Sequence, residues 1–214
     1  MTDLIINLTI ILLFLSLITF SFIGYGVLFV KIFYLEKNNS FSISHYSIFG
    51  MLFLVFVSYY SNLFLSHNEI FNSLLILIGI FNYIFFFKIK KKNESTITIL
   101  FLIIIYFSFF LISKNHDDFF YYHLSSGLNL VENKLQFGLA NLKLGYRHHS
   151  SVIHLMSLTY LPVVKYYLFN SINFIALLFT SLILFENIKK NINKNSIIMF
   201  FCLFFFILIN IKFK

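Results

Sequence analysis

The chain has 214 residues, of which 59% are hydrophobic and only 11% are charged, and its net charge is +8. A soluble domain carries about a quarter charged residues to solvate its surface, so this composition excludes a water-soluble fold. The positive charge does not indicate a nucleic-acid partner either, because the lysines cluster beside apolar runs and form no basic face. We therefore predict an all-α polytopic membrane protein, whose solvent is membrane lipid.

Six apolar runs are each long enough to approach the roughly 20 residues that a helix needs to cross a bilayer. They are continuous and do not alternate with polar residues, which favours helices over strands. The first run has no small-residue cleavage site behind it, so we interpret it as a retained span and not as a signal peptide. The predicted spans are residues 4–34, 45–65, 70–87, 97–113, 166–185 and 196–211.

Lysines cluster at residues 88–92 and again at residues 189–194. Because basic loops stay on the cytoplasmic side, and two spans separate these clusters, both can lie inside. This orientation predicts an integral protein of the bacterial inner membrane with the loop at residues 114–151 on the outer, periplasmic face. It also divides the chain into a three-helix membrane segment, residues 1–95, and a second part, residues 96–214.

The second part begins with the fourth span, and the polar loop follows. Asp117 and Asp118 come directly after this span. A helix through residues 116–130 would put Asp118 and Tyr122 one turn apart on one face, with His123 beside them. A carboxylate at this position can act as a general base for an acceptor hydroxyl or help to bind a divalent cation. The alternative is a solvated acid that only marks the end of the helix.

The loop also contains Arg147, the only arginine of the chain, followed by His148 and His149. The planar guanidinium suits two-point binding of a phosphate, and its alternative role is to anchor the loop to lipid headgroups. The two histidines can join Asp118 and His123 in a metal site, but their spacing matches no compact ligand motif, so the metal stays unknown. Histidines that hydrogen-bond to headgroups or backbone are the alternative.

Residues 150–161 predict an outer helix that lies in the membrane interface, with Ser150 or Ser151 as its cap. Pro162 interrupts the helix, because proline lacks the N–H that a helix interior requires. Two further spans complete the chain. The expected fold is thus about six transmembrane helices with one outer loop that contains interfacial helices.

The loop contains a D-x-x-x-Y-H pattern, formed by Asp118, Tyr122 and His123, followed by residues 138–142 and the serine pair at 150–151. This arrangement, over about residues 115–162, resembles a group of bacterial multi-pass membrane proteins related to the GT-C glycosyltransferases. The resemblance implies transfer of a sugar from a polyprenyl-phosphate donor on the outer face. It assigns the catalytic role to Asp118 and Asp117, and substrate binding to Tyr122, His123, Arg147, His148 and His149.

Three functions follow from these observations. The first is the N-terminal portion of such a glycosyltransferase, in which a second chain can supply further transmembrane helices. The second is a non-catalytic membrane subunit of envelope-polysaccharide assembly. The third is a polymerase or ligase of surface polysaccharide.

Overall fold

The computed structural model describes residues 2–33, 41–90, 93–112, 119–138, 141, 150–190, 194–195, 197–199, 201–202 and 205. Regular structure in this part of the chain is helical apart from one isolated β-bridge, which confirms the all-α prediction. The helices are α1 (Thr2–Ile32), α2 (Ile43–Asn62), α3 (Glu69–Lys90), α4 (Asn93–Ile112), α5 (His123–Glu132), α7 (Ser151–Leu158), the 3₁₀ helix η4 (Tyr166–Leu168) and α8 (Ser171–Lys190).

Within the described residues, four helical segments are long and apolar enough to cross a membrane: α1, α2, α3 and the segment from η4 through α8. They correspond to four of the predicted spans and indicate an integral membrane protein. The predicted span at 97–113 lies in α4 (Asn93–Ile112), a helix of 20 residues whose fully described part, Thr96–Ser108, is apolar but is not counted among these four segments. The predicted span at 196–211 lies mostly outside the described residues.

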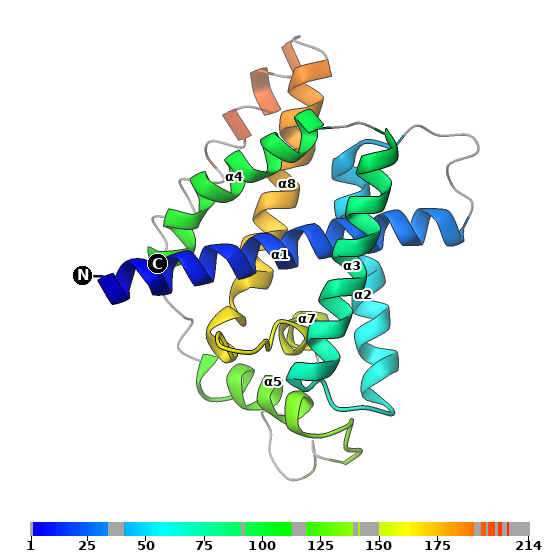
Figure 1. Cartoon of the computed structure of the whole chain (residues 1–214), viewed down its shortest axis with the longest axis vertical. Coiled ribbons are helices and arrows are strands. Elements are labelled where there is room, and N and C mark those ends of the chain that lie inside the picture. The colour runs from blue at the N-terminus through cyan, green and yellow to red at the C-terminus, as the bar shows by residue number, and fades with distance from the viewer. Residues whose placement is uncertain are drawn as a thin grey trace.

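Helix α1 lies across α2 and α3 and does not run alongside them (Figure 1). Glycines allow the close approach. A Cβ atom at Gly26 would lie 1.7 Å from the carbonyl oxygen of Tyr46, and one at Gly24 would lie 1.9 Å from that of Gly79. Small residues thus permit close packing of helices here, as they commonly do in membrane proteins.

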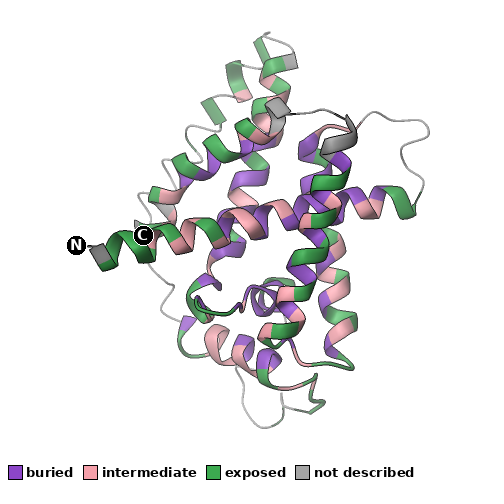
Figure 2. Ribbon diagram, viewed as in Figure 1, coloured by how far each residue is buried: buried purple, intermediate pink, exposed green. Residues whose placement is uncertain are grey.

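Buried apolar side chains from α1, α2, α3, α4, α7 and α8 form one hydrophobic cluster among the described residues (Figure 2). The largest fully buried members include Phe22, Phe169 and Phe179. The hydroxyl of Tyr106 also donates a hydrogen bond to Ser181 at 2.7 Å, which joins α4 to α8. Described residues from both parts of the chain thus contribute to one hydrophobic cluster.

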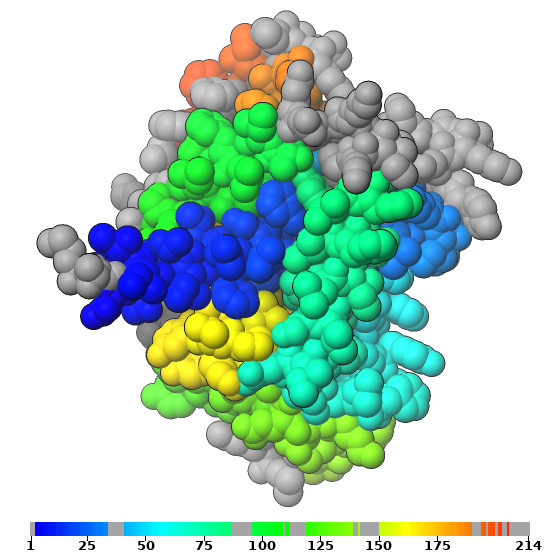
Figure 3. Space-filling model, in the orientation of Figure 1, coloured from blue at the N-terminus to red at the C-terminus, as the bar shows by residue number. Residues whose placement is uncertain are grey.

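The two ends of the helical assembly have different compositions. One end contains the start of α2 and the ends of α3 and α8, where Ser44 donates a hydrogen bond to Glu186 and where Lys90 and Lys189 lie (Figure 1). The other end contains the α2–α3 turn, α5 and α7. In Figure 3 the yellow surface of α7 and the following turn abuts the start of α3. Lysines from both predicted cytoplasmic clusters therefore share one end, and we call the opposite end the polar end.

The structure bears on two helices considered for the outer loop. A continuous helix over residues 116–130 is not formed, because Phe119–Tyr122 form turns and α5 begins only at His123. The predicted interfacial helix does form as α7, and Ser150 caps it by accepting a hydrogen bond from the Val152 amide at 3.1 Å. Residues 153–158 are all buried, so α7 packs against the rest of the protein, and its position at the membrane interface stays a prediction.

Candidate functional site

The polar end is organised around His67, a fully buried residue in the α2–α3 turn. Its Nδ1 lies 2.6 Å from the Ser157 hydroxyl of α7, and its Nε2 lies 2.9 Å from the Ser61 hydroxyl of α2. Ser157 donates its own proton to the carbonyl of His154 at 2.7 Å. It is therefore placed to accept from Nδ1–H, whereas the Ser61 hydroxyl lies within hydrogen-bonding distance of both Nε2 and the Ser58 carbonyl, which is 3.3 Å away. The imidazole thus links α2 to α7.

Burial, with a smaller contribution from neighbouring His154, lowers the pKa of His67 to about 3. An enclosed site disfavours the imidazolium because the charge loses its hydration. His154 is itself buried and stacks on Tyr59, with the ring centroids 3.8 Å apart. His67 therefore stays neutral at physiological pH, and its position fits a structural bridge better than a proton donor to a substrate.

Two buried asparagines attach the outer elements to the same turn. Nδ2 of Asn72 lies 2.7, 2.8 and 2.9 Å from the carbonyl oxygens of His67, Ser157 and Tyr160. Nδ2 of Asn62 lies 3.1 Å from the carbonyl oxygen of Leu130, which also accepts from the His67 amide. These bonds hold the end of α5 against the end of α2 and the α2–α3 turn, and they hold α7 and the segment after it against α3.

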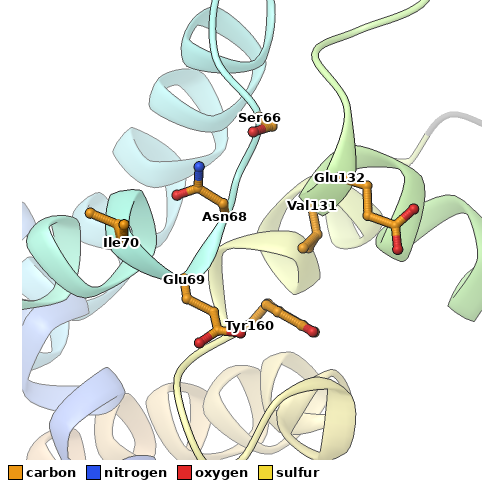
Figure 4. A pocket seen from close by; sticks show the side chains of 7 residues that line it. All are labelled: Ser66, Asn68, Glu69, Ile70, Val131, Glu132 and Tyr160. Carbon is orange, nitrogen blue, oxygen red and sulfur yellow. The ribbon is translucent and has the colours of Figure 1, made fainter.

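An open pocket of about 540 Å³ lies where the start of α3, the end of α5 and the segment after α7 meet (Figure 4). Glu69 and Tyr160 form one side of it, and the end of α5 forms the other. The ammonium of Lys165 pairs with Glu69 and lies 5.7 Å from the centre of the Tyr160 ring. The hydrogen bond to Glu69 raises the pKa of Lys165. The lining residues are Ser66, Asn68, Glu69, Ile70, Val131, Glu132 and Tyr160.

A tight turn after Pro162 places Lys165 beside the pocket. The Lys165 amide donates to the carbonyl of Leu161 at 2.8 Å, and the φ angles of Val163 and Lys165 are 71° and 45°. Residues other than glycine rarely adopt positive φ, so this turn stores backbone strain. Burial of Leu161 and Val164 in the core holds the strained turn in place.

Of the predicted site residues, the structure describes Tyr122 and His123. Tyr122 directly precedes α5, its ring centroid lies 4.1 Å from that of His123, and both side chains are partly exposed. Neither residue belongs to the pocket lining. The other predicted residues lie outside the described residues, and they are Asp117, Asp118, Arg147, His148 and His149.

Within the part of the chain that the structure describes, no group of three or more His, Cys, Asp or Glu side chains is arranged to hold a metal ion. The predicted metal site cannot be placed among these residues, since Asp118 and the histidine pair at 148–149 are not described. A divalent cation therefore stays a prediction of the sequence.

Sequence reasoning missed the residues that organise the polar end, above all His67, Glu69 and Asn72. Their signal was present, because polar side chains at the start of an apolar span are costly in a bilayer unless they have partners. Tyr160 and Lys165 gave no comparable signal. Only the fold brings them beside Glu69.

Residues 8–214 match the model of a family that is described as a domain of unknown function (DUF8201). The chain belongs to this family. The match includes α1 and its glycine contacts as well as the polar end, so both lie within the region that defines the family. No curated protein and no solved structure matches the chain.

Proposed function

We propose that the chain is part of a membrane glycosyltransferase that uses a polyprenyl-phosphate-linked sugar at its polar end. One observation carries this proposal. Tyr122 and His123, the described site residues of the predicted catalytic loop, belong to the same end of the protein as an open pocket lined by Glu69 and Glu132. Apolar helices that cross the bilayer would keep this end at the membrane surface, where a lipid donor presents its phosphate.

In the proposed reaction, the oxygen of an acceptor hydroxyl bonds to the anomeric carbon of the donor sugar. The bond between that carbon and the donor phosphate oxygen breaks, and the lipid phosphate leaves. Asp118, assisted by Asp117, takes the proton from the acceptor hydroxyl as general base. Arg147 binds the phosphate through two parallel hydrogen bonds. Tyr122, His123, His148 and His149 contact the substrates.

The orientation is part of the proposal. Lys90 and Lys189 lie at the end opposite α5 and α7, and basic residues of this kind remain in the cytoplasm. The polar end would then face the outer side of a bacterial inner membrane. Lipid-linked sugars presented on that side are the donors that the resemblance implies.

A non-catalytic subunit of envelope-polysaccharide assembly is the second candidate. Large apolar side chains are exposed beside α5 at the polar end, with 65% of Phe120, 74% of Tyr121 and 86% of Phe137 accessible. Such residues suit docking of a partner chain. The two candidates differ in whether the carboxylates of the loop are needed for sugar transfer.

The decisive variant is Asp118→Asn, because the amide keeps the shape of the side chain but cannot accept the proton. We expect a loss of sugar incorporation into envelope polysaccharide by a factor of about 10²–10⁴, with unchanged amounts of protein in the membrane. Asp3→Asn, in the first turn of α1, is the matched control. An equal and mild loss for Asp117, Asp118 and Glu132 variants would instead assign these acids to loop folding.

Arg147→Lys separates the two interpretations of the arginine. The lysine keeps the charge but loses the two-point geometry, so a phosphate-binding role predicts weaker donor binding. A headgroup anchor predicts no change, since either cation contributes about 1 kcal/mol at a membrane surface. Donor affinity measured for both proteins in the same membranes distinguishes these outcomes.

A further inference from the structure

The pocket at the polar end has the wrong charge for a phosphate. Its lining contains two carboxylates, Glu69 and Glu132, and Lys165, the cation beside it, is already paired with Glu69. A phosphate group in this space would face like charges and would find no available cation from this pair. The pocket therefore does not suit the donor phosphate, and because Lys165 neutralises one of the two carboxylates, it suits a ligand without negative charge.

The lining combines one aromatic surface with several hydrogen-bonding groups. The ring of Tyr160 offers an apolar face, and Glu69 and Glu132 offer strong acceptors. Asn68 uses its side-chain oxygen to cap α3, accepting from the Phe71 amide at 3.0 Å, which leaves its NH₂ group as a donor. The volume of the pocket, about 540 Å³, is within the range of small-molecule sites.

We propose that this pocket binds an uncharged sugar unit of a saccharide. A pyranose has an apolar C–H face that can lie on Tyr160 and hydroxyl groups that can donate to Glu69 and Glu132. The ion pair with Lys165 fixes the Glu69 carboxylate at the rim, and the strained turn after Pro162 fixes the lysine. Binding of the sugar stands independently of catalysis. Its role as the acceptor site rests on the proposed glycosyltransferase function.

The test uses the full chain in detergent micelles, with glucose and N-acetylglucosamine as probes and saturation-transfer NMR as the measurement. We expect at least one of the two sugars to bind, without displacement by inorganic phosphate. Tyr160→Ala should weaken binding about three- to tenfold, because it removes the aromatic face. Glu132→Gln should weaken it by about tenfold, because hydrogen bonds to a charged acceptor are the stronger ones.

Tyr160→Phe keeps the ring and should bind sugar as the wild type does, which guards against a loss caused by misfolding. Tyr60→Ala is the matched control, since Tyr60 is an exposed tyrosine of α2 outside the pocket lining. Binding that is absent for both sugars, unchanged by Tyr160→Ala and Glu132→Gln, or abolished by phosphate would overturn the proposal. Sugar binding without any transfer activity would contradict the glycosyltransferase and leave the pocket assignment intact.

Discussion

The crossing of α1 over α2 and α3 is held differently from the polar end. At the crossing, backbones meet at Gly24, Gly26 and Gly79 with no room for another atom. At the polar end, His67 and Asn72 join three elements through hydrogen bonds. Because lipid gives apolar helices little reason to associate, a membrane protein must use close backbone contact or buried polar bonds, and this chain uses both.

The stability of the two regions should also depend on different properties of their side chains. A backbone contact depends on size and is indifferent to pH. A hydrogen-bonded bridge through a neutral histidine depends on protonation, and it tolerates changes in volume better than changes in polarity. Each region should therefore fail under a different perturbation.

The largest effect is expected for Gly26→Leu. The new side chain would begin 1.7 Å from the Tyr46 carbonyl oxygen, so α1 and α2 would have to separate. We expect a loss of about 3 kcal/mol or more of stability, seen as reduced recovery of monodisperse protein in detergent. Thr9→Leu, at an exposed position of the same helix, should leave recovery unchanged. Normal recovery of Gly26→Leu would disprove the close crossing.

Asn72→Leu should have the next largest effect. The leucine is similar in size, but the carbonyl groups of His67, Ser157 and Tyr160 lose their shared donor. We expect destabilisation by about 2 kcal/mol, measured by thermal unfolding in detergent. Asn82→Leu is the control, because Asn82 bonds only to the Ile78 carbonyl of its own helix among the hydrogen bonds described. Equal melting temperatures for the two variants would refute the role of Asn72.

The smallest effect is a pH dependence that only the polar end should show. The pKa of His67 is about 3 in the folded protein and about 6.5 in the unfolded chain, so the unfolded state binds the proton first as pH falls. Stability is fully present above about pH 6.5 and declines towards pH 3. Between pH 7 and 5.5 this group should remove about 1 kcal/mol.

His67→Gln should flatten that part of the stability profile, since glutamine does not titrate. His45→Gln, at an exposed position of α2, should leave the profile as it is in the wild type. Parallel profiles for wild type and His67→Gln, measured by chemical unfolding across this pH range, would show that His67 is not the titrating bridge.

The sequence was sufficient to locate α1, α2, α3 and α8, because continuous apolar runs of about 20 residues have few other structures available to them. It did not reveal that α1 crosses its neighbours, which depends on contacts between glycines far apart in the chain. Helix α7 shows a second limit. Its short apolar sequence predicted the helix, but only packing against other elements shows that residues 153–158 are buried.

Some residues of the candidate site could likewise be predicted from the sequence, and others could not. Tyr122 and His123 were predicted from a local pattern, and α5 begins at His123, later than the pattern indicated, because Phe119–Tyr122 form turns. Glu69 and Tyr160 could not be connected from the sequence, since their proximity depends on how the α2–α3 turn, α5 and α7 pack together. Local patterns therefore predicted candidate chemistry, and the fold added the pocket.

The claim that underlies the proposed function is that the polar end and the lysine-bearing end face opposite sides of the membrane. Single cysteines at Lys134 and Lys189, both exposed, test it in a Cys202→Ser background. A membrane-impermeant maleimide added to intact cells with a permeable outer envelope should label position 134, and should label position 189 only after the inner membrane is opened. Labelling of position 189 alone in intact cells would contradict the orientation and, with it, a lipid-linked donor on the outer face.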